Sequence, residues 1–133
     1  MTNTVIDMLI RIKNAQMAKH EHVSVPSSKA KIKIAEILTE FGYLTNFEKK
    51  TKKSKKSEHE YLMLQLKYTD GQEGLSGIKL ISKPSRRIYI KAQEIKPVRS
   101  GYGISVISTP KGIMSSIQAK KDNLGGELLF EVW

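Results

Sequence analysis

The apolar residues of this chain change their spacing near residue 42, and that change limits the folds open to it. In two groups before it they recur every three or four positions, as on one face of a helix. The first group predicts a helix over residues 5–18. A second helix follows Ser27 and Ser28, which can cap it, and ends before Gly42. The two apolar groups are Val5, Met8, Leu9, Ile12 and Ala15, and then Ile34, Ile37, Leu38 and Phe41.

Elsewhere in the first half, apolar and polar residues alternate, as in half-buried strands. Residues 43–48 and 61–68 predict two strands joined as a hairpin, and residues 22–25, ended by Pro26, predict a third. Residues 49–56 lie between the hairpin strands and hold six lysines in eight positions. Their mutual repulsion predicts a mobile lysine-rich loop over residues 49–58.

The second half carries mainly strand patterns. The expected strands are 78–81, 86–91, 104–107 and the terminal run 128–133, with a short helix over 115–121. Turn signals at Asp70-Gly71 and over 74–77 mark a boundary. We therefore expect an α+β fold of two small domains. Residues 1–70 form an α/β domain with two helices and a three-stranded sheet, and residues 71–133 form a β-rich domain with a short helix.

The charge of the chain indicates a polyanionic partner. Lys and Arg total 23 against 13 Asp and Glu, which gives a formal net charge of +10. Residues 1–66 hold 12 basic and 7 acidic residues, and residues 67–133 hold 11 and 6, so each part carries +5. Cations that neutralise phosphates release condensed counterions, which favours nucleic acid. Because the excess is spread along the chain, the folded body itself is expected to meet the polyanion.

Features that the sequence lacks indicate the cellular compartment of the protein. The chain has no cysteine, which excludes disulfides and thiolate metal sites and fits a reducing cytoplasm. No apolar run approaches the roughly 20 residues of a membrane span, and the first residues lack the pattern of a secretion signal. We expect a cytoplasmic protein with no membrane partner.

Two segments of the second half carry candidate RNA contacts. Over residues 86–91, Ile88 and Ile90 face one way, and Arg87, Tyr89 and Lys91 face the other, offering cations for phosphate and a ring for stacking. A solvated strand face would have the same pattern. Residues 108–112 (STPKG) place two hydroxyls, a lysine and a glycine at a strand end, which suits the shallow minor groove of RNA. A simple turn with solvated hydroxyls is the alternative for this segment.

Other chemistries are weaker. Ser108 and Lys111 form the Ser-x-x-Lys pattern of a small serine hydrolase, but the companion Ser-Asp-Asn and Lys-Thr-Gly elements are absent, and Pro110 and Gly112 disfavour a helix carrying the pair. The residues considered as metal ligands are His20, Glu21, His22 and His59, and they lack ligand spacing. We expect no enzyme, metal or cofactor. The lysine-rich loop leaves open a general module that binds nucleic acid or acidic proteins.

Several blocks together resemble a known family. They are 8–14 (MLIRIKN), 25–29 (VPSSK), 82–89 (SKPSRRIY), 101–104 (GYGI), 108–114 (STPKGIM) and 125–128 (GGEL). The chain resembles, in register from about residue 4 to Trp133, the bacterial small-subunit ribosomal protein S-eight family. That resemblance implies a structural constituent of the ribosome with the two-domain architecture above and no catalytic activity.

The resemblance also implies partners. Members of this family are primary binders of the central domain of small-subunit ribosomal RNA and support assembly of the small subunit, near the proteins S-five and S-two. In some bacteria they repress translation of their own operon by binding its messenger RNA. The resemblance thus implies a cytoplasmic protein of the small ribosomal subunit.

Site residues follow from the matching blocks. The resemblance places Ser108, Thr109, Lys111 and Gly112 in the loop that enters the RNA minor groove. The residues beside or flanking that loop are Glu127, Tyr89, Arg86 and Arg87. Lys91 is a candidate RNA contact from the strand pattern alone. The residues implied to touch a second RNA segment, chiefly at its phosphates, are Arg11, Lys13, Asn14, Ser28 and Lys29.

The chain departs from the family pattern at two positions near the implied site. Pro110 stands where the family usually has serine, which removes a hydroxyl and a backbone N–H from the contact loop and stiffens it. Lys120 stands where arginine is usual, so that a bidentate phosphate contact becomes a point charge. The tract 49–60 also differs from the family pattern.

Overall fold

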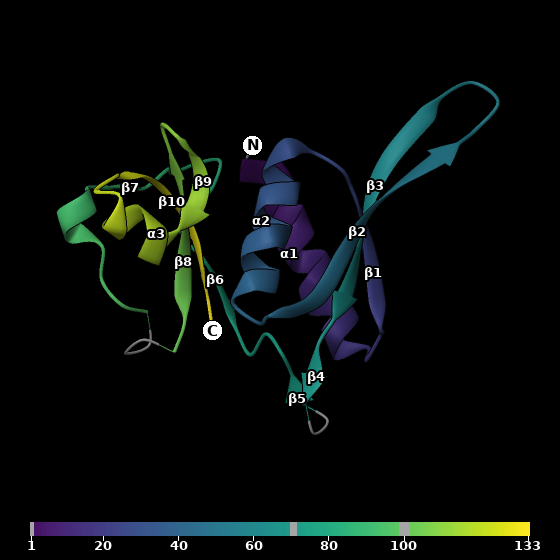
Figure 1. Ribbon diagram of the computed structural model, residues 1–133, viewed down its shortest axis with the longest axis horizontal. Coiled ribbons are helices and arrows are strands. Elements are labelled where there is room, and N and C mark those ends of the chain that lie inside the picture. The colour runs from purple at the N-terminus through teal and green to yellow at the C-terminus, as the bar shows by residue number, and fades with distance from the viewer. Residues whose placement is uncertain (1, 70–71, 99–101) are drawn as a thin grey trace. The chain divides into compact units, whose positions relative to one another are not determined.

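A computed structural model describes residues 2–69, 72–98 and 102–133 of the protein (Figure 1). Two compact units result: the N-terminal unit is Asp7–Gly74, and the C-terminal unit combines Met1–Ile6 with Leu75–Trp133. Both contain antiparallel sheet and helix, so the predicted α+β class is confirmed. The division into independent domains 1–70 and 71–133 stays a prediction.

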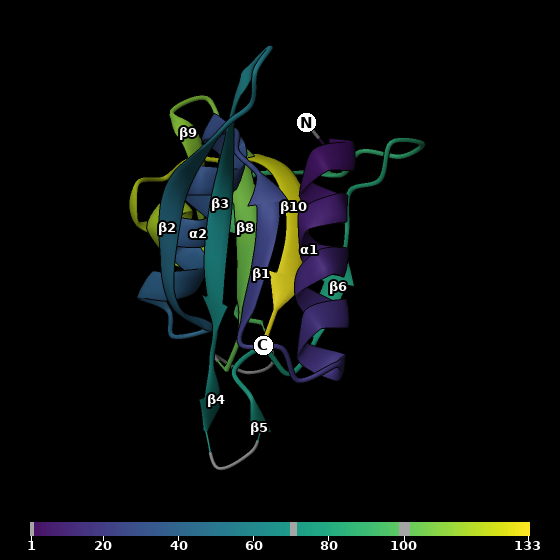
Figure 2. The same ribbon diagram turned by 90° about the vertical axis from the view of Figure 1, so that its right-hand side faces the viewer.

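The N-terminal unit has the predicted two helices and three-stranded sheet. The elements are α1 (Thr2–Met17, shared with the other unit), β1 (His22–Pro26), α2 (Lys29–Glu40), β2 (Leu44–Lys53) and β3 (Glu58–Leu66), with the small pair β4 (Tyr68–Thr69) and β5 (Gln72–Glu73). The sheet order is β1-β3-β2. Val25, Leu62 and Leu64 are at most 1% exposed and form the core face of the sheet, on the side where α2 lies (Figure 2). The opposite face carries polar and half-buried side chains.

Both ends of α2 follow the sequence prediction. Ser28 is the N-cap residue, and its hydroxyl accepts a hydrogen bond from the Lys31 N–H at 3.2 Å. At the other end Gly42 has a φ of +81°, a conformation that glycine adopts without steric cost. Helix α1 begins at Thr2, earlier than the predicted residue 5.

The lysine-rich segment differs from the expected loop. Strand β2 continues through Lys53 and β3 resumes at Glu58, so that only residues 54–57 connect the strands. The physical reason lies on β3. Glu58 and Glu60 are ion-paired with Lys53 and Lys49 at 4.0 and 3.2 Å, which offsets the repulsion among the lysines. The interpretation from sequence weighed the lysines alone and not the acids on the opposite strand.

The C-terminal unit is mostly β, as predicted. Its elements are β6 (Ile78–Leu80), β7 (Tyr89–Ile90), the 3-10 helix η1 (Ala92–Glu94), β8 (Ile104–Thr109), β9 (Gly112–Ser115), α3 (Ser116–Lys121) and β10 (Gly126–Val132). The sheet order is β6-β10-β8-β9, and β7 also pairs with β10. One core cluster consists of Ile95, Ile107 and Ala119, with Ile90, Met114 and Leu128 packed against it. Strand β10 changes register between Leu128 and Phe130, which makes a β-bulge there.

The expected strand over 86–91 is much shorter in the structure. Only Tyr89–Ile90 pair with β10, whereas Lys83 and Arg86 form an isolated bridge around a turn. That turn holds Pro84, and the ladder cannot continue through it. The predicted alternation of exposure is confirmed, because Ile88 and Ile90 are half-buried and Arg87, Tyr89 and Lys91 are exposed.

The expected loop after Ile107 is a tight hairpin. Strand β8 extends to Thr109, β9 begins at Gly112, and Thr109 pairs with Gly112. Only Pro110 and Lys111 remain as the connection. Proline and glycine correctly indicated a turn, but the strand on its far side, β9, was not predicted. We refer to residues 109–112 as the contact hairpin.

Candidate nucleic-acid interface

The contact hairpin is held by the side chain of Thr109. Its hydroxyl donates to the Gly112 carbonyl at 2.7 Å and accepts from the Lys111 N–H at 3.2 Å. Thr109 is 8% exposed, whereas Pro110 and Lys111 are exposed. Gly112 has a φ of +118°, which side chains rarely adopt. Thr109 and Gly112 therefore shape the turn, and Lys111 projects its charge from it.

Three side chains form a row across the sheet beside this hairpin. Glu127 on β10 lies opposite Ser108 on β8 and opposite Tyr89 on β7. Directly opposed residues of antiparallel strands share a face of the sheet. The row, which we call the carboxylate row, thus presents a ring, a carboxylate and a hydroxyl side by side. The resemblance implied that Glu127 and Tyr89 lie near this loop, and the register adds that Glu127 stands directly opposite both Ser108 and Tyr89.

Glu127 has an unusual environment. Its side chain is half-buried, and its Oε2 is a buried oxygen with no hydrogen-bond partner among the described residues. A buried acceptor without a partner costs free energy. Such an oxygen is suited to accept hydrogen bonds from a ligand that supplies the missing donor.

The carboxylate row borders a hollow of about 600 Å³. The hollow is lined by Tyr89, Lys91, Glu94, Ser108, Pro110 and Glu127, among others. At its base Gly126 approaches β8 so closely that a Cβ there would meet the Ser108 carbonyl oxygen. Glycine at this position is therefore what allows β10 to enter between β7 and β8.

Arg86 and Arg87 lie next to β7 and are exposed. Their segment is anchored by Ser82, whose hydroxyl donates to the Leu128 carbonyl at 2.6 Å and accepts from the Ile88 N–H at 3.0 Å. Ser82 is 1% exposed. Sequence reasoning quoted Ser82 within a motif but assigned it no role. A serine just before a Lys-Pro turn was the available signal.

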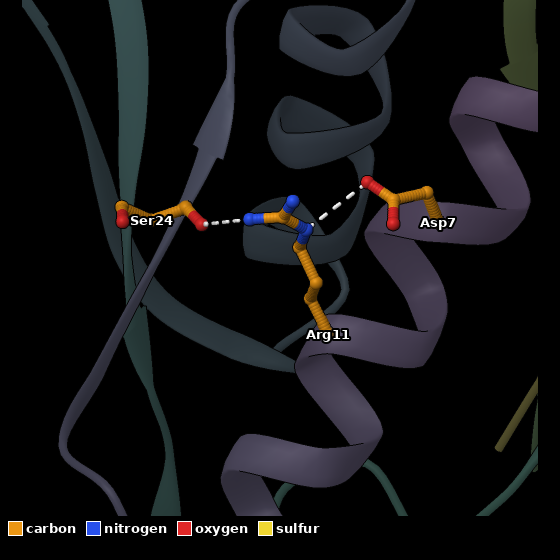
Figure 3. A network of polar contacts seen from close by, with 3 residues as sticks. All are labelled: Asp7, Arg11 and Ser24. Atoms are coloured by element: carbon orange, nitrogen blue, oxygen red, sulfur yellow. Dashed lines mark hydrogen bonds and ion pairs between the residues drawn. The ribbon is translucent and has the colours of Figure 1, made fainter.

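The remaining predicted residues belong to the N-terminal unit and form a separate group. Lys13, Asn14 and Lys29 are exposed. The hydroxyl of Ser28 caps α2. Figure 3 shows that Arg11 reaches across from α1, where its Nε donates to Asp7 at 3.0 Å and its Nη1 donates to the Ser24 carbonyl at 3.4 Å. Arg11 is thus held in place by its neighbours.

Catalytic and metal chemistry find little support in the geometry. Ser108 is on a strand and Lys111 in a turn, so the pair does not share a helix face as the hydrolase pattern requires. His59 contacts the Ser57 hydroxyl at 2.8 Å. Within residues 2–69, 72–98 and 102–133 no three His, Cys, Asp or Glu side chains cluster as metal ligands would. No helix of the described chain is long and apolar enough to cross a membrane.

Comparison with known proteins also indicates a protein without catalytic activity. The chain matches the family described as "Ribosomal protein S8" over residues 3–133. It is 43% identical over 133 residues to the "Small ribosomal subunit protein uS8" of Oleidesulfovibrio alaskensis, with 100% of this chain and 99% of the relative covered. The protein of that name from Clostridioides difficile is 45% identical over 136 residues, with 100% and 98% covered. That of Spiroplasma kunkelii is 46% identical over 133 residues, with 100% and 99% covered.

The fold, the basic surface and these matches define a ribosomal protein, and not an enzyme. The chain belongs to the ribosomal protein S8 family. The family prediction is thereby confirmed, and with it the expected place on the small subunit of the cytoplasmic ribosome.

Proposed function

We propose that this protein is a primary binder of small-subunit ribosomal RNA, that it contacts the central domain of that RNA, and that its binding supports assembly of the subunit. The contact surface in this proposal is the contact hairpin together with the carboxylate row. The observation that carries the proposal is the unpartnered Glu127 oxygen, set between Ser108 and Tyr89 at the edge of a hollow.

The chemistry of the row fits the minor groove of folded RNA. That groove displays ribose 2′-hydroxyls and the amino group of guanine, which are hydrogen-bond donors. An ionised carboxylate only accepts, and a serine hydroxyl both donates and accepts. Glu127 can therefore bind a hydrogen-bond donor of the groove, and Ser108 can bind a neighbouring acceptor. Tyr89 is 67% exposed and offers a ring for stacking.

In the proposal, the cations around the carboxylate row bind phosphates and do not read groups in the groove. Lys111 at the hairpin tip and Arg86 and Arg87 beside β7 are exposed, and they position the RNA through its phosphates. In the N-terminal unit, Lys13, Asn14 and Lys29 are exposed for a second RNA segment. Arg11 and Ser28 support them, since both side chains are engaged within the unit.

The resemblance extends the proposal to further partners. It implies neighbouring proteins S-five and S-two in the subunit. It also implies repression of the protein's own operon through a messenger RNA that imitates the ribosomal site. The repression would use the same hairpin and row, because the messenger RNA resembles the ribosomal site.

Two binding titrations test the proposal. The full chain is titrated with a central-domain fragment of small-subunit RNA and, separately, with an unrelated RNA duplex of equal length at physiological salt. We expect the fragment to bind tighter by on the order of a thousandfold, as for sequence-specific recognition. Equal affinities would overturn the proposal, because counterion release alone does not distinguish the two RNAs.

A further inference from the structure

The β2–β3 hairpin extends well beyond the sheet from which it comes (Figures 1 and 2). Strand β1 pairs with β3 only as far as Pro26 and Tyr61, followed by one hydrogen bond from the Ser27 N–H to the Glu60 carbonyl. Strands β2 and β3 stay paired to Lys53 and Glu58. We call residues 49–60 the lysine arm. All of them are exposed, and six are lysines.

One face of the lysine arm is neutralised by its own acids. Residues opposite each other in the register share a face, so Lys49, Thr51 and Lys53 lie with Glu58 and Glu60. Lys49 is ion-paired with Glu60 at 3.2 Å, and Lys53 with Glu58 at 4.0 Å. Two lysines therefore meet two carboxylates, and this face has little charge to offer a ligand.

The opposite face and the tip keep their positive charge. Lys50 and Lys52 lie opposite Tyr61 and His59, and the single acid there is Glu48, 3.8 Å from Lys50. Lys52 has no ion pair within the described part of the chain. The same holds for two lysines in the connection between the strands, Lys55 and Lys56. We call this side of the arm its open face.

The open face leads into a groove at the base of the arm. The groove has a volume of about 740 Å³, and its lining includes Arg11, Ser24, Lys52, His59, Glu60 and Tyr61. The Arg11 side chain is held at its rim by Asp7 and Ser24 (Figure 3). Cations and an aromatic ring thus follow one another from the tip to the groove.

We propose that the open face of the lysine arm, its tip and this groove form a further RNA-binding surface, which holds an RNA strand by its phosphate backbone without regard to sequence. Lys55 and Lys56 contact phosphates at the tip, and Lys52 does so at the groove. Tyr61 supplies a ring on which a base can stack. This surface is separate from the contact hairpin and rests on the proposed function only in taking RNA as the ligand.

The composition of the arm favours RNA over an acidic protein. The binding energy of protein interfaces is concentrated in buried Trp, Tyr and Arg side chains, and the outer part of the arm, residues 52–58, contains only Lys, Ser and Glu. Lysine ammonium groups are mobile point charges, suited to phosphates whose positions vary with sequence and conformation. A surface of this kind gains affinity chiefly from counterion release.

The experiment compares two double variants that remove equal charge. Lys55→Ala with Lys56→Ala removes two unpaired lysines of the tip, and Lys49→Ala with Lys53→Ala removes the two ion-paired lysines of the neutral face. The probe is an oligouridine of about 12 nucleotides, within the length that single-strand-binding surfaces cover. It has no folded groove for the contact hairpin to read.

We expect the tip variant to reduce the slope of log K against log salt by about 1.4, that is, about 0.7 for each lost phosphate contact on single strands. The neutral-face variant should change the slope by less than half as much. The single variant Lys52→Ala should reduce the salt slope by about 0.7. Its control is Lys49→Ala, which should again change the slope by less than half as much. Equal reductions in both members of a pair would overturn the proposal, because net charge alone would explain them. Unchanged slopes in all of the variants would also overturn the proposal. An acidic protein would then be the better candidate for the partner of the arm.

The same variants separate this proposal from the proposed function. Both double variants should keep the preference of the wild type for the central-domain fragment over an unrelated duplex, since that preference depends on the contact hairpin. Absence of that preference in the wild type would count against the proposed function alone. Equal effects of the matched double variants would count against the lysine arm alone.

Discussion

Glu127 and Ser108 face each other across the β8–β10 ladder, and the carboxylate oxygen Oε2 of Glu127 is buried without a hydrogen-bond partner in the described chain. The carboxylate is therefore positioned by backbone register. Its place depends on the pairing of β10 with β8 and β7, and the hydrogen-bonding capacity of Oε2 is unused within the described chain.

Replacement of Glu127 by glutamine should separate stability from recognition. Glu127→Gln removes the charge from a buried oxygen and adds a donor that can find a partner in the hollow. We expect the free protein to gain about 1 kcal/mol of stability, measured by thermal unfolding. Affinity for the central-domain fragment should fall about tenfold, which corresponds to roughly 1.4 kcal/mol. An unchanged affinity would mean that RNA does not use this carboxylate.

Alanine substitutions of Ser108 and of Lys111 should change RNA binding in different ways. Lys111→Ala removes a point charge from an exposed tip, so binding to every RNA should weaken and the salt slope should become shallower by about 0.9. Ser108→Ala should mainly lower the preference for the central-domain fragment, since a hydroxyl reads groups in the groove. Filter binding at several salt concentrations measures both effects. The assignment of roles would be wrong if the two variants behaved alike.

Pro110 offers a test of the departure from the family pattern. Pro110→Ser frees the backbone of the contact hairpin in the unfolded state, so we expect the free energy of unfolding to fall by about 0.5–1 kcal/mol. The new N–H and hydroxyl should at the same time raise affinity for the central-domain fragment. Urea unfolding and RNA titration of the same preparation check both directions. A loss of affinity would show that stiffness matters more than the added donors.

Ser82 should be a structural determinant of the site. Its hydroxyl joins the segment before β7 to β10 through Ile88 and Leu128. Ser82→Ala leaves the Ile88 N–H without its acceptor, and we expect a loss of about 2 kcal/mol in urea unfolding together with weaker RNA binding. Ser85→Ala, at an exposed position of the same turn, is the matched control and should leave both quantities unchanged.

Much of the fold could be predicted because the local signals agree with the packing. The helical spacing before residue 42, the Ser28 cap and the positive φ of Gly42 all recur in the structure. The alternation of Leu62, Leu64 and Leu66 with more exposed neighbours also recurs. These features depend on residues close in sequence, which is why the sequence displays them.

What could not be predicted depends on partners distant in sequence. The length of β2 depends on the acids of β3, and the segment before β7 is held to β10 through Ser82. Strand β9 has no strong pattern of its own and exists through its pairing with β8. For the candidate site, the residue types were evident from the sequence. The resemblance implied that Glu127 and Tyr89 lie near the loop with Ser108, but their direct opposition across the strands is a matter of register, which the sequence did not show.

The β-bulge of β10 has a consequence for how the chain can vary. Leu128 pairs with Ile107 and Phe130 with Val106, so Leu129 is the extra residue between them. Removing one position there, or adding another, would turn Glu127 toward the hydrophobic interior or rotate Phe130 out of it. The stretch 127–130 should therefore accept exchanges of side chains far more readily than any insertion or deletion.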